Sequence, residues 1–192
     1  MPRAGLNTDQ VVAAGAALAD EIGFSALSLA GLADRLGVRP PALYKHVDSL
    51  ADLHRRIATL AMTELADEFR DALQGQAGAD ALAALFTTLR RYVERHPGRY
   101  SATIGAEFHG DDDPLLAAAL RVINSIRAVL SGYGIGPDDL DHAIRTLRCT
   151  LHGFAVLTAG NGFQWSNDLD DSFAWMIDFA DAGLRTIGDR QR

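Results

Sequence analysis

The stretch of sequence that decides the fold is residues 25–47, which reads SALSLAGLADRLGVRPPALYKHV. Ser28 is a good helix N-cap, and Gly37 is suited to the left-handed conformation that closes helices, so we expect a short helix between them. Two prolines follow the glycine turn. Because proline is favoured in the first turn of a helix, they predict a second short helix from Pro40 to Lys45 or His46. Two short helices joined by a tight turn form a helix-turn-helix pattern.

The second helix of this pair carries side chains that suit DNA. We expect Leu43 and Val47 to face inward and the other side chains to point outward. Arginine can bind guanine through two hydrogen bonds, flat apolar groups suit a thymine methyl, and polar groups bind phosphate oxygens. The candidate DNA-binding residues are Ser28, Arg39, Pro40, Pro41, Ala42, Tyr44, Lys45, His46 and Ser49. A helical hairpin with a purely structural role has the same spacing, and the pattern alone leaves it open.

The rest of the chain predicts an all-α protein. Apolar residues recur at helical spacing almost throughout, and no run alternates as a strand would. We expect about nine helices, which divide into an N-terminal domain of three helices that includes the helix-turn-helix and a larger C-terminal helical domain. The domain boundaries are expected at 1–48 and 49–192, with 49–73 as a connecting helix. Besides the helix-turn-helix, the expected helices are 8–22, 49–73, 82–93, a short helix after the corner at 96–98, 114–132, 137–159 and 168–187.

Composition excludes several classes of protein. The 192 residues include 18 Lys+Arg and 25 Asp+Glu, a formal charge of −7. That balance excludes a chain that coats nucleic acid by bulk positive charge. It does not exclude a local basic face, since residues 1–56 hold six basic and six acidic residues and are neutral. The single cysteine, Cys149, cannot supply a disulfide framework or a metal cluster. We expect no signal peptide or membrane span, and therefore a cytoplasmic protein.

Motifs for catalysis or for a bound metal are not evident. The run Asp111-Asp112-Asp113 next to His109 could mimic a metal site, but acidic residues before a proline are typical of a helix start. The sequence has no Gly-x-Ser-x-Gly or His-Glu-x-x-His motif. We therefore expect no enzyme activity, no catalytic residue, no cofactor and no metal.

The helix-turn-helix region closely resembles the DNA-binding domain of the TetR family of transcriptional regulators. The resemblance covers about residues 7–57 and has its core in Ala33-x-x-Leu36-Gly37-Val38 and Leu43-Tyr44-x-His46. It implies a dimeric, repressor-like protein whose N-terminal three-helix domain binds a palindromic operator, with a small-molecule effector bound by the larger domain. Family members commonly have a lysine that contacts phosphate where this chain has Leu50. The hydroxyl of Ser49 is expected to replace part of that contact.

The C-terminal part resembles the domain of one TetR subgroup, which is named for a Trp-His-Gly motif. The resemblance lies in residues 151–154 and 173–175, with Leu151 in place of the tryptophan. In the family, the last two helices pack against those of a second subunit as a four-helix bundle. The residues expected at a homodimer interface are His152, Gly153, Trp175, Phe179 and Gly183. A wide apolar face buried within one subunit is the alternative.

An effector pocket between the C-terminal helices is expected to have aromatic walls. The candidates are Phe86, Tyr92, Tyr100, Ile104, Phe108, Ile123, Leu147, Leu151 and Phe154. Core packing explains most of these equally well, and His152 is expected to be a buried, hydrogen-bonded histidine. Two classes of function remain. One is a ligand-responsive regulator, with repression expected, and the other is a small all-α enzyme or binding module with a structural hairpin.

Overall fold

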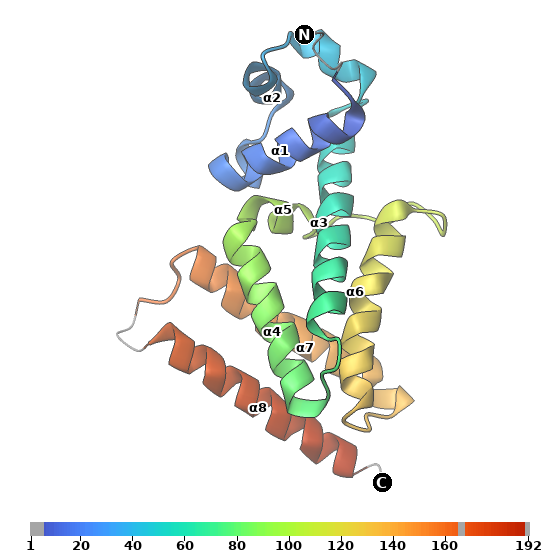
Figure 1. The fold of residues 1–192 in the computed structure, drawn as a ribbon, viewed down its shortest axis with the longest axis vertical. Helices are drawn as coiled ribbons and strands as arrows, with labels where there is room; N and C mark the ends of the chain where they lie inside the picture. Colours follow the sequence, from blue (N-terminus) through green and yellow to red (C-terminus); the bar gives the residue numbers. More distant parts are fainter. Residues whose placement is uncertain (1–5, 165–167, 191–192) are drawn as a thin grey trace. The chain divides into compact units, whose positions relative to one another are not determined.

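A computed structural model describes residues 6–164 and 168–190, and all regular structure in these ranges is helical (Figure 1). The all-α prediction is confirmed. The nine expected helices are present, and a one-turn 3-10 helix is added after the first. The elements are α1 (Thr8–Ile22), η1 (Phe24–Ala26), α2 (Leu29–Leu36), η2 (Pro40–Lys45), α3 (Leu50–Ala72), α4 (Gly78–Arg95), α5 (Pro97–Ala102), α6 (Pro114–Ser131), α7 (Pro137–Ala159) and α8 (Leu169–Asp189).

The chain divides into two compact units. The N-terminal unit runs through Glu64 and also includes Arg95–Ala118, which holds α5 and the start of α6. The C-terminal unit consists of Leu65–Glu94 and the chain from Ala119 onward. Helices α3 and α6 therefore contribute residues to both units. The domain boundary expected between residues 48 and 49 remains a prediction. The first five residues of the expected N-terminal domain lie outside the described ranges.

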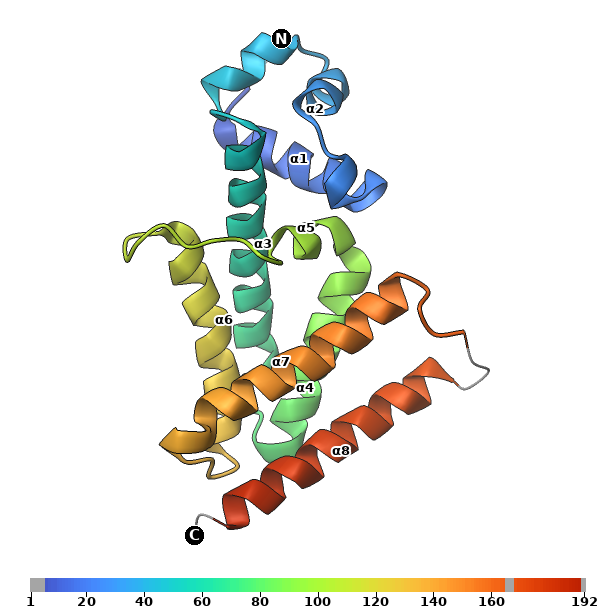
Figure 2. The same cartoon turned by 180° about the vertical axis from the view of Figure 1, so that it is seen from behind.

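The core of the N-terminal unit consists of apolar side chains from α1, α2, η2 and the first turns of α3 (Figure 2). The fully buried side chains come from each of these elements and include Val11, Leu32, Leu43, Leu53 and Ile57. Helix α1 buries two adjacent lines of small and branched residues, 11/15/18 and 12/16/19. Ile22 at its last position is 49% exposed.

Helix ends in this unit follow local sequence. Asn7 accepts the N–H of Gln10 at 2.8 Å, and the Gln10 side chain accepts the N–H of Asn7 at 3.1 Å, which is a capping box. Ser28 caps α2 by accepting the N–H of Gly31 at 3.1 Å. Gly37 closes α2 in the left-handed region, at φ 66° and ψ 32°. Both ends of α2 are therefore as predicted.

The C-terminal unit buries the apolar faces of α4, α7 and α8. Phe86 and Tyr92 of α4 are fully buried, and Leu147 and Leu151 of α7 and Phe173 of α8 are each less than 9% exposed. Helices α7 and α8 lie side by side in both views (Figures 1 and 2). Tyr133, in the turn between α6 and α7, donates its hydroxyl to Asp181 of α8 at 2.6 Å. This bond attaches that turn to the last helix.

Helix α6 meets the length and composition of a membrane-spanning helix. It has 18 residues with a mean hydropathy of 1.3 and is, in the described ranges, the helix long and apolar enough to cross a membrane. The alanines and leucines between its charges raise the average to this value. Arg121 and Arg127 are nevertheless exposed on it, and Leu115 and Leu130 are buried in the fold.

Candidate nucleic-acid interface

The helix-turn-helix is formed by α2, the turn at Gly37 and η2. The Gly37 N–H donates to the carbonyls of Ala33 and Asp34, and the Val38 N–H donates to Ala33 O at 3.0 Å. Arg39 then takes an extended conformation, at φ −80° and ψ 144°, and begins η2. The glycine turn thus directs the chain from one short helix straight into the next.

The second element has the expected bounds but is a 3-10 helix. Ala42 N–H donates to Arg39 O at 2.9 Å and His46 N–H donates to Leu43 O at 2.8 Å, both with the 3-10 spacing. The two prolines at its start have no N–H to donate, so few backbone bonds hold the element. Its position depends on Leu43 and Val47, which are 0% and 1% exposed as predicted.

The side chains predicted to contact DNA lie mainly on the outer side of η2. Tyr44 is 57% exposed. Ala42 and His46 are half-buried. The remaining candidates on this element are exposed, namely Arg39, Pro40, Pro41 and Lys45. We call residues 39–46 the η2 surface.

The two serine candidates are helix caps. Ser28 accepts the Gly31 N–H, and the hydroxyl of Ser49 accepts the Asp52 N–H at 3.0 Å. Each hydroxyl oxygen is therefore used as an acceptor, while its own hydrogen can still be donated to a phosphate oxygen. Leu50 is half-buried and packs against the core of the unit. An apolar contact thus occupies the position where the resemblance implies a lysine.

Some cations of the helix-turn-helix region are paired with a carboxylate, and others are not. Arg35 is held by both carboxylate oxygens of Glu21 at 2.6 and 2.7 Å, which lowers the pKa of Glu21. Arg56 pairs with Asp52 at 2.9 Å. Arg39 and Lys45 have no carboxylate within ion-pair distance among residues 6–164 and 168–190. The cations left for an external anion are thus on the η2 surface.

The predicted effector residues are distributed over both units. Phe86, Tyr92 and the α7 candidates are buried in the C-terminal unit, while Tyr100 is buried in the N-terminal unit. Ile104 and Phe108 also belong to the N-terminal unit, and each is 51% exposed. The α7 candidates are Leu147, Leu151 and Phe154, and Ile123 of α6 is half-buried. An effector site made of all nine residues remains a prediction.

The predicted dimer residues lie on the outer side of α7 and α8. Trp175 and Phe179 are 67% and 66% exposed, and their rings stack at 5.4 Å between centroids. A Cβ atom added to Gly153 or Gly183 would meet no atom within 4 Å. His152 is half-buried, and burial together with the charge of Arg148 lowers its pKa. We call this surface, with the exposed Val156, the α7–α8 face.

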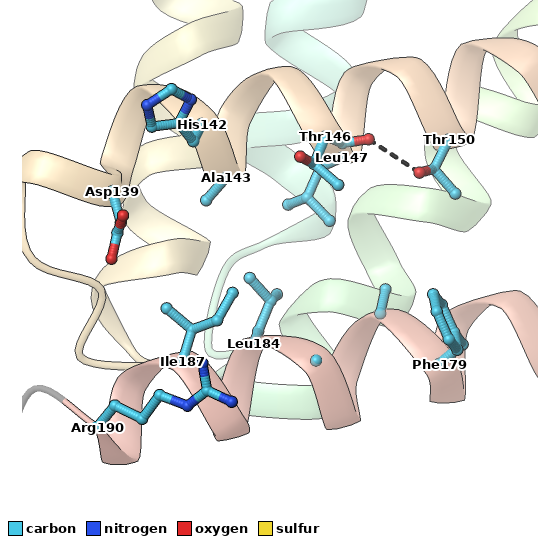
Figure 3. Close-up of a pocket in the computed structure, with 12 residues that line it drawn as sticks. Asp139, His142, Ala143, Thr146, Leu147, Thr150, Phe179, Leu184, Ile187 and Arg190 are labelled. Atoms are coloured by element: carbon cyan, nitrogen blue, oxygen red, sulfur yellow. Dashed lines mark hydrogen bonds between the residues drawn. The ribbon is translucent and has the colours of Figure 1, made fainter.

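A groove of about 420 Å³ runs between α7 and α8 (Figure 3). Leu147 from α7 and Leu184 and Ile187 from α8 point toward one another across it. Phe179 and Gly183 line the same groove, which is therefore continuous with the α7–α8 face. This groove could not be located from the sequence, because its floor is made by core residues of two separate helices.

Comparison with known proteins decides the family. Residues 11–57 match the model of the tetR family of bacterial regulatory proteins, and residues 82–180 match the tetracyclin repressor-like C-terminal domain. The chain belongs to the TetR family. It is a DNA-binding transcriptional regulator by family, and the helix-turn-helix is the part matched by the first model.

Two relatives of this TetR-family regulator cover most of its length. YobS of Bacillus subtilis, described as an uncharacterized HTH-type transcriptional regulator, is 30% identical over 92% of this chain and 91% of its own. Rv0681 of Mycobacterium tuberculosis has the same description and is 32% identical over 93% of this chain and 82% of its own. Both relatives are described as transcriptional regulators, and each aligns with more than nine tenths of this chain.

Solved structures show the same fold at lower identity. BioQ of Mycobacterium smegmatis has a TM-score of 0.73 at 22% identity and covers 96% of this chain and 100% of its own. A TetR variant from Acinetobacter baumannii AYE, solved in complex with minocycline, has a TM-score of 0.71 at 22% identity, with 95% of this chain and 98% of its own covered.

Proposed function

We propose that this TetR-family regulator is a ligand-responsive repressor, which binds a palindromic operator as a homodimer and is released by a small-molecule effector. The observation that carries the proposal is the η2 surface. Its cations Arg39 and Lys45 have no acidic partner in the described residues, and they stand on an element fixed by buried Leu43 and Val47. A cation without an internal partner keeps its full charge for phosphate or guanine.

Each residue of the η2 surface has a proposed role. Arg39 reads a guanine, Pro41 and Ala42 contact a thymine methyl, and Tyr44, Lys45 and His46 bind phosphate. Pro40 orients the first turn of the element. The hydroxyls of Ser28 and Ser49 add phosphate contacts at the starts of α2 and α3. Because operators of dimeric helix-turn-helix proteins have half-sites about one helical turn, ~34 Å, apart, both copies of η2 must be correctly spaced.

The α7–α8 face is proposed to supply the dimer contact. Glycine costs a helix about 1 kcal/mol relative to alanine, and no neighbouring atom in this protomer requires glycine at positions 153 or 183. Close approach of a helix from a second copy would explain why glycine occupies these two positions. The groove beside them exposes apolar side chains to water, and it would accept side chains of a second copy.

The effector is proposed to bind within residues 82–180, which match the family model of the C-terminal domain. A neighbour in fold was solved with minocycline, which shows that this architecture accommodates a small molecule in that protein. Helix α3 contributes residues to both units, so a change near Phe69 can reach Leu53 along one helix. The protein is proposed to act in the cytoplasm, where its operator lies.

A mobility-shift assay with DNA flanking its own gene tests the proposal. Sequence-specific retardation at physiological salt, resistant to excess unrelated duplex, is the expected result. In vitro transcription from the same fragment should fall when the protein is added, if it is a repressor. No retardation of any genomic fragment would contradict DNA binding, and a rise in transcription would contradict repression alone.

A further inference from the structure

Lys45 is the single lysine of the chain, and the other 17 basic side chains are arginines. A guanidinium stays protonated in proteins, so its nitrogen atoms do not attack electrophiles. The amine of a lysine can lose its proton, and the neutral form is a nucleophile that accepts acyl groups. A reagent that transfers acyl groups to amines therefore has one side chain in this sequence to react with, and that side chain lies on η2.

The Lys45 side chain is exposed on an element whose backbone is fixed. The N–H groups of the next two residues, His46 and Val47, both donate to the Leu43 carbonyl, at 2.8 and 3.0 Å. Leu43 and Val47 are themselves buried in the core of the N-terminal unit. The Lys45 amine is therefore open to a reagent in solution, while the backbone that carries it stays in place.

No carboxylate among residues 6–164 and 168–190 lies within ion-pair distance of the Lys45 amine. Arg35 of the same region differs, because Glu21 binds it at 2.6 and 2.7 Å. A carboxylate partner stabilises the protonated form of an amine, and that form has no electron pair with which to attack an acyl carbon. Lys45 is not held in the unreactive form by such a partner.

The η2 surface also suits one class of acyl donor. Arg39 and Lys45 are exposed cations without an acidic partner in the described residues, and they attract anions. An acyl phosphate combines a charged phosphate, which resembles the phosphate of a DNA backbone, with an activated acyl carbon. If its phosphate binds where a DNA phosphate is proposed to bind, the acyl carbon is brought close to the Lys45 amine.

We propose that Lys45 is an acylation site, which reacts with an acyl phosphate, and that acylation switches off DNA binding by the η2 surface. The neutral amine attacks the acyl carbon, so that a C–N bond forms and the C–O bond to the phosphate breaks. The phosphate leaves with the bonding electrons, and the surplus proton of the amine passes to water. The product is an uncharged amide, so each protomer loses one cation. This inference rests on the proposed operator binding.

Acylation and DNA binding exclude each other in this scheme, because both use the same amine. An acylated Lys45 has no positive charge to offer a phosphate. A Lys45 amine in contact with a phosphate of the duplex is shielded from an acyl donor. The modification therefore acts on protein that is free of DNA and keeps it from the operator.

The first test compares two lysines within one chain. Arg127→Lys places a second lysine on α6, at an exposed position that, like Lys45, has no carboxylate partner in the part of the chain that the structure describes. Acetyl phosphate should label Lys45 at least about threefold faster than position 127, as measured by peptide mass spectrometry. N-hydroxysuccinimide acetate, an uncharged acyl donor, should label both at similar rates. Equal rates with acetyl phosphate, or the same preference with both donors, would overturn the phosphate-directed site.

The second test measures DNA binding, with an operator duplex selected from a random library by the untreated wild type. Complete acetylation of Lys45 should lower the affinity at least about tenfold at physiological salt. Bound duplex should in turn slow acetylation of Lys45 and not that of position 127. Lys45→Gln, which has an uncharged amide, should bind as weakly as the acetylated protein. The affinity of Lys45→Arg should not change on treatment with acetyl phosphate.

Unchanged affinity after complete acetylation would overturn the switch, as would a duplex that leaves the labelling rate of Lys45 unaltered. An equal loss of affinity in treated Lys45→Arg would assign the effect to another group and would also overturn it. An untreated wild type that selects no duplex would instead refute the proposed operator binding. The labelling rates of Lys45 and position 127 would still decide whether Lys45 is the preferred acylation site.

Discussion

The η2 surface and the α7–α8 face are both exposed, but they are built differently. The η2 surface presents Arg39 and Lys45 around a fully buried Leu43. The α7–α8 face presents stacked Trp175 and Phe179 that water solvates poorly. Water solvates charged groups well until they bind an anion. Covering an exposed aromatic ring with another apolar surface, by contrast, lowers the free energy. The first surface therefore supports the proposed contact with DNA, and the second supports the proposed dimer contact.

The largest expected effect comes from the α7–α8 face. Trp175→Glu with Phe179→Glu should give a monomer, because two buried carboxylates would face their symmetry mates in the dimer. Loss of the second η2 should lower operator affinity by at least about 100-fold. Sedimentation velocity and a titration with labelled operator measure the two effects.

Leu120→Glu is the matched control for this variant, since Leu120 is also an exposed apolar residue, at 42%, but lies on α6. It should remain a dimer with wild-type affinity. If the double variant stays dimeric at micromolar concentration, the interface lies elsewhere.

Two adjacent residues of η2 should separate stability from binding. Leu43→Ala creates a cavity at a fully buried position and should lower the free energy of unfolding of the N-terminal unit by about 2–5 kcal/mol. Tyr44→Ala, at an exposed position, should change it by less than about 0.5 kcal/mol and weaken binding to all duplexes. Urea unfolding and fluorescence anisotropy measure these effects. Equal destabilisation by both variants would contradict the outward orientation of Tyr44.

A smaller effect is expected from Lys45. Lys45→Ala should weaken binding to specific and unrelated duplexes by a similar factor, since phosphate contacts carry no sequence information. It should also reduce the slope of log affinity against log salt by about 1. Arg56→Ala serves as the comparison, because Arg56 is already paired with Asp52. A slope unchanged in Lys45→Ala would remove that residue from the phosphate contacts.

The smallest expected effect concerns Asp113, away from both surfaces. The His109 N–H and the Arg55 guanidinium lower the pKa of Asp113 to about 2. A depressed pKa in the folded state stabilises the protein above the ordinary value near 4, and this contribution is lost as the pH falls toward 2. Asp113→Asn should therefore lower stability at neutral pH and flatten its decline between about pH 4 and 2. Thermal unfolding across this range is the measurement, and an unchanged decline would contradict the assignment.

Much of the fold was predictable because local rules govern it. The bounds of α2 follow from Ser28 and Gly37, and the structure uses both residues as expected. The start of α1 is likewise local, since it is set by the capping box of Asn7 and Gln10. The inward positions of Leu43 and Val47 follow from helical spacing. The sequence could not show that η2 is a 3-10 helix, since six residues after two prolines fit either form.

Contacts between distant parts of the chain were not predictable. The backbone N–H of Arg99 donates to the Asp20 carboxylate although the two residues are 79 positions apart, and no local motif in the sequence predicts this bond. The pairing of Arg55 with Asp113 and the groove between α7 and α8 likewise depend on packing. For the site, the sequence identified the exposed candidates of η2, but not which cations are already neutralised by Glu21 or Asp52.

The most direct test of DNA reading by the η2 surface is parallel selection from a random duplex library with the wild type and Arg39→Ala. The wild type should enrich a palindrome with half-sites about one helical turn apart. Arg39→Ala should enrich the same palindrome with a guanine preference lost at one symmetric pair of positions, equivalent to about 1–3 kcal/mol per contact. Identical preferences in the two selections, or no enriched sequence with the wild type, would contradict the account.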